Sequence, residues 1–162
     1  MATAYVTALR MLARRRLTEA ALFAKLEQRG FEEDEARAAV ERCKAERYLD
    51  DRLFAQLHVE SAVERRNVGD RRLVAELVRK GVDPEAARTA VSQAARGDGE
   101  RSERDRAEAA LARMLRVEAG RSDASLARAL ERLGFPTPLI YEVLRERAAG
   151  LLAEAVDPLA SD

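Results

Sequence analysis

The sequence predicts an all-α protein made of three tandem three-helix repeats of helix-turn-helix type, arranged in an elongated, curved array. Three observations support this fold class. A Leu-x-x-x-Leu block that ends in Gly followed by Phe or Val occurs three times, with spacings of 51 and then 53 positions. Each copy has the signals of a helix start and a helix end, and no segment has the pattern of a strand. The three blocks span Leu22–Phe31, Leu73–Val82 and Leu126–Phe135.

The middle helix of each repeat has two predictable ends. A cap residue followed by an acid precedes each block, and an acid in the first turn interacts favourably with the helix dipole. At the other end, glycine is the residue that most easily closes a helix in the left-handed conformation. The following apolar residue should contact the second leucine of the block, as in a Schellman motif. The starts are Thr18-Glu19, Gly69-Asp70 and Ser122-Asp123, and the closing glycines are Gly30, Gly81 and Gly134.

Each middle helix should lie between two others. Apolar residues at three- and four-residue spacing predict preceding helices over Tyr5–Arg16, Asp51–Arg66 and Arg104–Ala119. The third helix should begin with Asp83 or Thr137 as the cap and a proline at the first helical position. At the start of the second repeat, we interpret Asp50 and Asp51 as a cap and a dipole partner, rather than as a metal or catalytic pair.

These elements divide the chain into residues 1–48, 49–97 and 98–155, followed by a frayed tail over 156–162. The first junction, Ala45–Asp51, is compact, whereas Arg96–Glu100 contains two glycines and no apolar anchor. We therefore expect a hinge between the second and third repeats.

Composition argues against several functions. The chain has 29 basic and 29 acidic residues, so bulk positive charge cannot hold it on nucleic acid. Phosphate-binding glycine loops, metal-ligand spacings and cysteine pairs are absent from the sequence, so we expect no enzyme activity, no metal and no cofactor. Cys43 is the single cysteine, and no apolar run is long enough to span a membrane. We expect a monomer in the cytoplasm.

The best candidates for contact residues are basic clusters near helix ends. Arginine pairs well with both carboxylate and phosphate groups. Compensation of the helix dipole would also place arginines there, without any ligand. The candidates are Arg14, Arg15, Arg16, Arg65, Arg66, Arg71, Arg72, Arg79 and Lys80.

The run Tyr48-Leu49-Asp50-Asp51-Arg52-Leu53-Phe54-Ala55 and the block from Gly69 to Val82 resemble the bacterial RecX regulators. The segment from Ala8 to Arg15 and the first leucine block fit the same family, whereas Arg52 stands where the family more often has an acid. The resemblance implies a non-enzymatic modulator that lodges in the groove of the RecA filament on single-stranded DNA. It also implies inhibition of recombinase ATP hydrolysis, coprotease action and strand exchange.

Two other functions remain open at this point. A helix-turn-helix module could bind single- or double-stranded DNA without a recombinase, although Asn67 is the only asparagine available for reading bases. A helical-repeat adaptor for other proteins is the third possibility.

Overall fold

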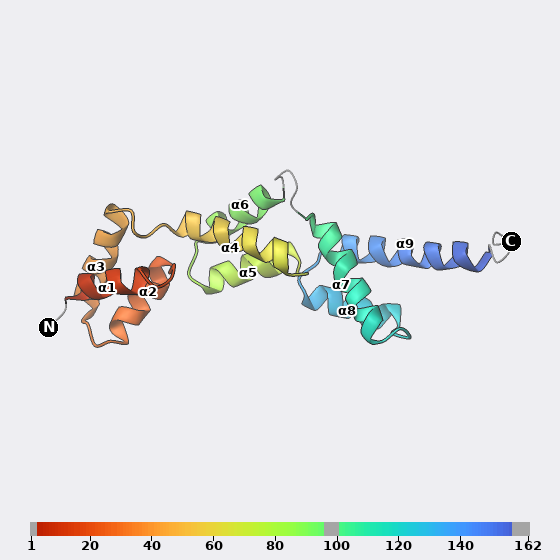
Figure 1. The fold of residues 1–162 in the computed structure, drawn as a ribbon, viewed down its shortest axis with the longest axis horizontal. Helices are drawn as coiled ribbons and strands as arrows, with labels where there is room; N and C mark the ends of the chain where they lie inside the picture. Colours follow the sequence, from red (N-terminus) through yellow and green to blue (C-terminus); the bar gives the residue numbers. More distant parts are fainter. Residues whose placement is uncertain (1–2, 96–100, 157–162) are drawn as a thin grey trace. The chain divides into compact units, whose positions relative to one another are not determined.

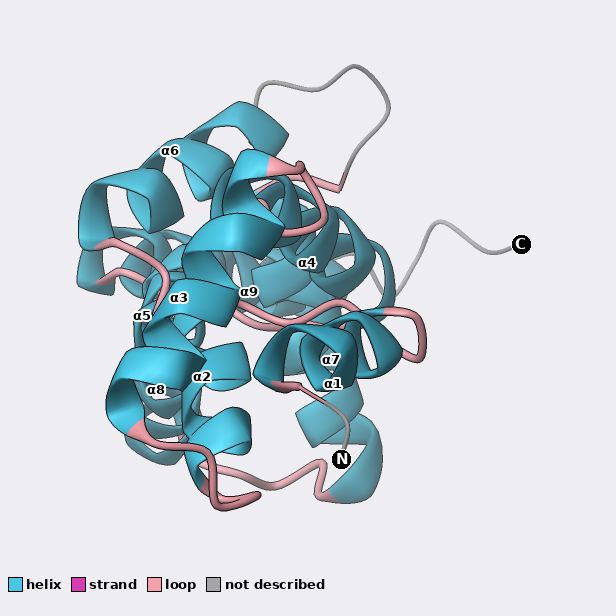
Figure 2. Ribbon diagram, turned by 90° about the vertical axis from the view of Figure 1, so that its left-hand side faces the viewer, coloured by secondary structure: helices cyan, strands magenta, loops and turns pink. Residues whose placement is uncertain are grey.

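A computed structural model of the chain describes residues 3–95 and 101–156. Within these ranges the chain forms nine α-helices and no strand (Figures 1 and 2). The predicted all-α fold of three-helix repeats is confirmed. The helices are α1 (Ala4–Leu12), α2 (Glu19–Glu27), α3 (Glu33–Ala45), α4 (Asp51–Arg65), α5 (Asp70–Arg79), α6 (Pro84–Ala94), α7 (Glu103–Val117), α8 (Asp123–Arg132) and α9 (Thr137–Val156).

The leucine blocks form the centre of the repeats. All six block leucines are fully buried, and burying a leucine side chain contributes about 1.5–3 kcal/mol. In the first repeat, Leu22 and Leu26 lie in a core with small residues such as Ala8 and Cys43. In the third repeat, the corresponding leucines share a core with Phe135. The block is therefore a core motif, as its spacing predicts.

The predicted helix closures are confirmed. Gly30, Gly81 and Gly134 have φ angles of 86°, 91° and 91°. After α5, the Val82 N–H donates to the Leu77 carbonyl at 3.1 Å, and the Gly81 N–H donates to the Val78 carbonyl at 2.9 Å. Both bonds have their equivalents after α2 and α8, which makes each closure a Schellman motif.

Two boundary predictions need correction, and two others lie beyond the described residues. Helix α1 ends at Leu12 rather than Arg16, so the first arginine cluster follows the helix in a turn. Thr137 is the first residue of α9, and the Pro136 carbonyl accepts its first helical hydrogen bond, so Pro136 takes the cap position predicted for Thr137. The proposed hinge at 96–100 and the tail from 157 onward lie outside the described residues.

The chain divides into two compact units, and the divisions fall inside α4 and α5. The first unit contains Met1–Ser61 and Val74–Arg96, and the second contains Ala62–Leu73 and Gly97–Asp162. The stretch from Ala62 to Leu73 belongs with the third repeat in the second unit. Each unit contains one joint between consecutive repeats.

The joint in the first unit ties the start of α2 to the second repeat. The Thr18 hydroxyl donates to the Lys80 carbonyl at 2.6 Å, and the Glu19 N–H donates to the Asp51 carboxylate at 2.9 Å. Gly81 lies directly on α2, because a Cβ atom added to it would be 2.3 Å from the Cβ of Ala20. Asp51 thus caps a helix of the preceding repeat, a role that the sequence did not predict.

The joint in the second unit repeats this arrangement with different side chains. The Gly69 N–H donates to the Leu133 carbonyl at 2.9 Å, and the Asp70 N–H donates to the Glu103 carboxylate at 2.7 Å. Gly134 lies on the start of α5, because a Cβ atom added to it would be 2.6 Å from the Arg72 backbone nitrogen. Equivalent pairs of hydrogen bonds therefore join the first repeat to the second and the second to the third.

A buried arginine strengthens the second joint. The Arg106 side chain is 1% exposed, and its guanidinium donates to the Val68 carbonyl and, at 2.6 Å, to the Asp70 carboxylate. Beside it, Arg101 donates to the Asn67 side-chain oxygen at 2.7 Å. These bonds fix the loop before α5 on helix α7, and this loop carries part of the candidate site.

Candidate functional site

Six of the nine predicted contact residues line two separate pockets, one in each unit. The first, here the N-terminal basic pocket, has a volume of about 410 Å³. Arg14, Arg15 and Arg16 line it from the loop after α1, and Arg47 lines it from the end of α3. Its other lining residues include Tyr48, Asp50, Leu53 and Phe54.

Arg47 and Tyr48 were not predicted from sequence, and both are well placed to bind a ligand. Arg47 has a φ of 62° and closes α3 at the position that glycine occupies after α2, α5 and α8. A left-handed non-glycine residue costs about 1–2 kcal/mol, and such strain is concentrated at functional sites. Tyr48 is 58% exposed. The sequence signal that could have identified Arg47 was the absence of a glycine at the end of α3.

The C-terminal basic pocket has a volume of about 520 Å³ and lies in the second unit. Arg65, Arg66 and Arg72 line it from the end of α4 and the start of α5, and the structure adds Arg113 and Arg121 from α7 and the loop that follows. Glu118 is its single carboxylate, and the apolar lining consists of Val68, Ala110, Met114, Val117 and Leu133.

The two pockets share one part of the repeat. Residues 14–17 line the first and residues 65–68 line the second, which is the repeat spacing of 51 positions. This stretch follows the first helix in repeat one, begins at the last residue of the first helix in repeat two, and ends in a buried apolar residue, Leu17 or Val68. The exposed arginines therefore sit on an anchored loop. Arg14–Arg16 directly follow the end of α1, so the dipole of that helix also favours positive charge there.

The remaining predicted residues do not line either basic pocket. Arg71 is exposed at the start of α5, and Arg79 is exposed at its end. Lys80 also has an exposed side chain, and its carbonyl oxygen accepts the hydrogen bond from Thr18. The arginines of the end of α4 are thus brought together with residues of the third repeat rather than with Arg79 and Lys80.

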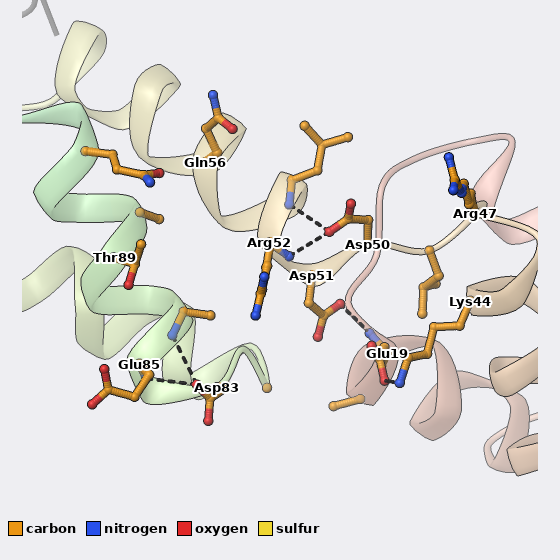
Figure 3. Close-up of a pocket in the computed structure, with 17 residues that line it drawn as sticks. Glu19, Lys44, Arg47, Asp50, Asp51, Arg52, Gln56, Asp83, Glu85 and Thr89 are labelled. Atoms are coloured by element: carbon orange, nitrogen blue, oxygen red, sulfur yellow. Dashed lines mark hydrogen bonds and ion pairs between the residues drawn. The ribbon is translucent and has the colours of Figure 1, made fainter.

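A larger groove of about 1380 Å³ lies in the first unit beside the joint (Figure 3). Its carboxylates already have partners. Asp50 caps α4 by accepting from the N–H groups of Arg52 and Leu53 at 3.0 Å each, which confirms its predicted role. Asp83 caps α6, and Glu19 pairs with Lys44 at 2.9 Å. Structural bonds therefore occupy these acids, and we see no general acid or base among them.

Burial affects the acids that hold the joints. Desolvation raises the pKa of Asp51, partly offset by the hydrogen bond from the Glu19 backbone. Desolvation also raises the pKa of Glu103, against the opposing hydrogen bond from the Asp70 backbone. Burial and a backbone hydrogen bond are the two leading influences on both acids, which hold equivalent joints. Among the described residues, no group of three metal-ligating side chains comes together, and no helix is long and apolar enough to cross a bilayer.

Comparisons with known proteins agree with this architecture. The family model described as the first three-helix domain of RecX matches residues 4–43, and the model of its second three-helix domain matches residues 50–91. A regulatory protein RecX of Thermus thermophilus is 40% identical over 138 residues, covering 85% of this chain and 87% of the relative. Regulatory protein RecX of Mycobacterium avium is 36% identical over 147 residues, covering 87% and 83%.

Solved structures show the same fold. A crystal structure of RecX from Lactobacillus salivarius superposes with a TM-score of 0.76 at 18% identity, covering 88% of this chain and 93% of that one. A second crystal structure of regulatory protein RecX gives a TM-score of 0.78, also at 18% identity, over 88% of this chain and 70% of that one. The family models cover the first two repeats, and the fold matches extend over most of the chain. This chain belongs to the RecX family of regulatory proteins.

Proposed function

We propose that the chain modulates the RecA recombinase in the bacterial cytoplasm, binding in the groove of the RecA filament on single-stranded DNA. It restrains ATP hydrolysis, coprotease activity and strand exchange by occupying that groove. The observation that carries this proposal is the pair of basic pockets at equivalent positions of successive repeats. A ligand with a regular repeat, such as a filament, can use equivalent sites on successive repeats of its partner.

The charge distribution supports a partner with dispersed acidic groups. The whole chain has no net charge, yet each pocket combines four or five arginines with one carboxylate. Local positive potential can direct binding even when the total charge is zero. Each exposed ion pair contributes only about 0.2–1 kcal/mol, so affinity for the filament must come from several contacts at once.

The direct test is the ATPase rate of the recombinase from the same cell on single-stranded DNA, measured with increasing amounts of this protein. Reversing the charge at Arg65, Arg66, Arg71 and Arg72 should weaken inhibition and filament binding, while circular dichroism stays unchanged. A matched control reverses four exposed arginines that line neither basic pocket: Arg29, Arg128, Arg132 and Arg145. Equal inhibition by both fourfold variants would place the contact surface elsewhere.

Direct binding to single-stranded DNA is a second candidate function, favoured by one observation. The exposed Tyr48 ring lies in the same pocket as four arginines, and stacking on aromatic rings together with backbone contacts to arginine is a common way to hold single strands. Helix-turn-helix binding in a major groove is less well supported. The third helix α3 begins with Glu33, Asp34 and Glu35, which would repel phosphates.

Fluorescence anisotropy with a labelled oligothymidylate, without recombinase, tests this second function. Tyr48→Ala should weaken binding if a base stacks on the ring. Unchanged affinity would rule out the stacking contact, and charge attraction alone would then account for the binding.

A further inference from the structure

We propose that the C-terminal basic pocket binds an acidic segment of a partner protein, with carboxylates on its arginines and an apolar side chain against Val117 and Met114. This inference rests on the proposed function and specifies the partner chemistry at one of its two pockets. The other pocket differs in its lining, so the two need not bind the same ligand.

The charged lining of this pocket comes from two parts of the second unit. Arg65, Arg66 and Arg72 lie around the loop before α5, while Arg113 and Arg121 lie on and after α7. Glu118 is the only opposing charge in the lining. Within the described part of the chain, Arg113 is exposed and has no ion-pair partner. Guanidinium groups bind carboxylates with two parallel hydrogen bonds, which favours a ligand carrying several acids.

The apolar lining decides between an acidic peptide and a nucleic acid. It contains no aromatic residue, and its side chains are aliphatic or, at Met114, a thioether. Bases bind to single-strand sites largely by stacking on aromatic rings, which this pocket lacks. Aliphatic and methionine side chains instead accept apolar side chains of varied shape. The N-terminal basic pocket, by contrast, is lined by Tyr48 and Phe54.

The apolar contact surface is available to a partner. Val117 ends α7 and is 84% exposed, the largest exposed fraction among the exposed large apolar residues of the described chain. Met114 is half-buried one turn earlier and also packs on the core of the third repeat. An exposed apolar residue beside a cluster of arginines fits a segment in which acids flank an apolar side chain. The loop on the opposite wall is fixed by Arg101 and Arg106, so the pocket is formed before binding.

The test uses the full chain and a fluorescein-labelled peptide of alternating glutamate and aspartate with two leucines. Anisotropy should show binding that weakens as salt rises. Arg113→Glu and Val117→Ser should each weaken it by about tenfold, because the proposal places both side chains in contact with the ligand. Control variants are Arg128→Glu, an exposed charge on α8, and Leu152→Ser, which is 67% exposed on α9. They should change the affinity by less than about twofold.

Three results would overturn the inference. The first is failure of the peptide to bind. The second is equal binding of a peptide with serine in place of both leucines, or full binding by Val117→Ser, since charge alone would then explain the attraction. The third is loss of oligothymidylate binding in Val117→Ser, which would identify a nucleic-acid site. The ATPase assay with recombinase is a separate measurement, so failure here leaves the proposed function to be judged by its own test.

Discussion

Replacing Gly81 with alanine should destabilise the protein more than replacing Gly30, although both close a helix in the left-handed conformation. Their φ angles are 91° and 86°, so each new side chain carries a similar backbone cost of about 1–2 kcal/mol. The surroundings differ. No atom lies within 4 Å of a Cβ added at Gly30, whereas one added at Gly81 is 2.3 Å from the Ala20 Cβ. Relieving that overlap requires helix α2 to move, since the Ala20 Cβ is fixed to its backbone.

Overpacking of this kind costs about 1–3 kcal/mol, so Gly81→Ala should lose that much more stability than Gly30→Ala. Both glycines lie in the first unit, which makes the comparison direct. Urea denaturation followed by far-ultraviolet circular dichroism gives both free energies of unfolding, with equal m-values as a check on two-state behaviour. Equal losses in the two variants would mean that the joint between repeats one and two does not hold Gly81 against α2.

Three further predictions concern the joints. Asp51→Asn should retain most of the stability, because the amide oxygen can still accept from the Glu19 N–H, while Asp51→Ala should lose about 1–2 kcal/mol by denaturant titration. Burial raises the pKa values of Asp51 and Glu103, so the folded state binds protons more tightly than the unfolded state. The stabilisation from these two acids should therefore be greatest below the ordinary carboxyl pKa and fall as pH rises through their raised pKa values. A double Asp51→Asn, Glu103→Gln variant should show a flatter dependence of the free energy of unfolding on pH. Arg106→Met should cost about 3 kcal/mol, because it leaves the Asp70 carboxylate and a buried carbonyl without their donor, and a loss below about 1 kcal/mol would contradict the proposed importance of this network.

Local signals were sufficient to predict the cap of α2 and the closures of the three middle helices. The cap at Thr18 accepts from Ala21, three residues away, and the Schellman bond after α2 joins Phe31 to Leu26. Both bonds connect neighbours in the sequence, so cap and glycine chemistry determine them directly. The three-helix organisation followed from the repetition of these signals, and the fold and family assignments are confirmed.

The joints could not be predicted, because their partners lie far apart in the sequence. Arg106 bonds to Asp70, 36 positions away, and a charged residue on a helix is ordinarily expected at the surface. Asp51 was assigned a local role and Glu103 none, although both stand at the start of the first helix of a repeat, 52 positions apart. Their equivalent positions were the sequence signal from which a shared role could have been predicted. For the site, the arginines of one wall were predictable from the sequence, but Arg113 and Arg121 come from the next repeat, and their position depends on the joint.

The composition of the two joints determines how many residues of such a sequence can be replaced while the fold is kept. Of the atoms that meet there, the Lys80 and Leu133 carbonyls and the N–H groups of Glu19, Gly69 and Asp70 belong to the main chain. Every residue supplies a carbonyl and every residue except proline supplies an N–H, so substitutions outside the closely packed glycines leave these groups in place. The hydrogen bond to the closing turn can thus come from the Thr18 hydroxyl in the first joint and from the Gly69 N–H in the second. Bacterial lineages can accordingly replace most side chains of such a protein and keep its backbone arrangement, as the 18% identity at a TM-score of 0.76 illustrates.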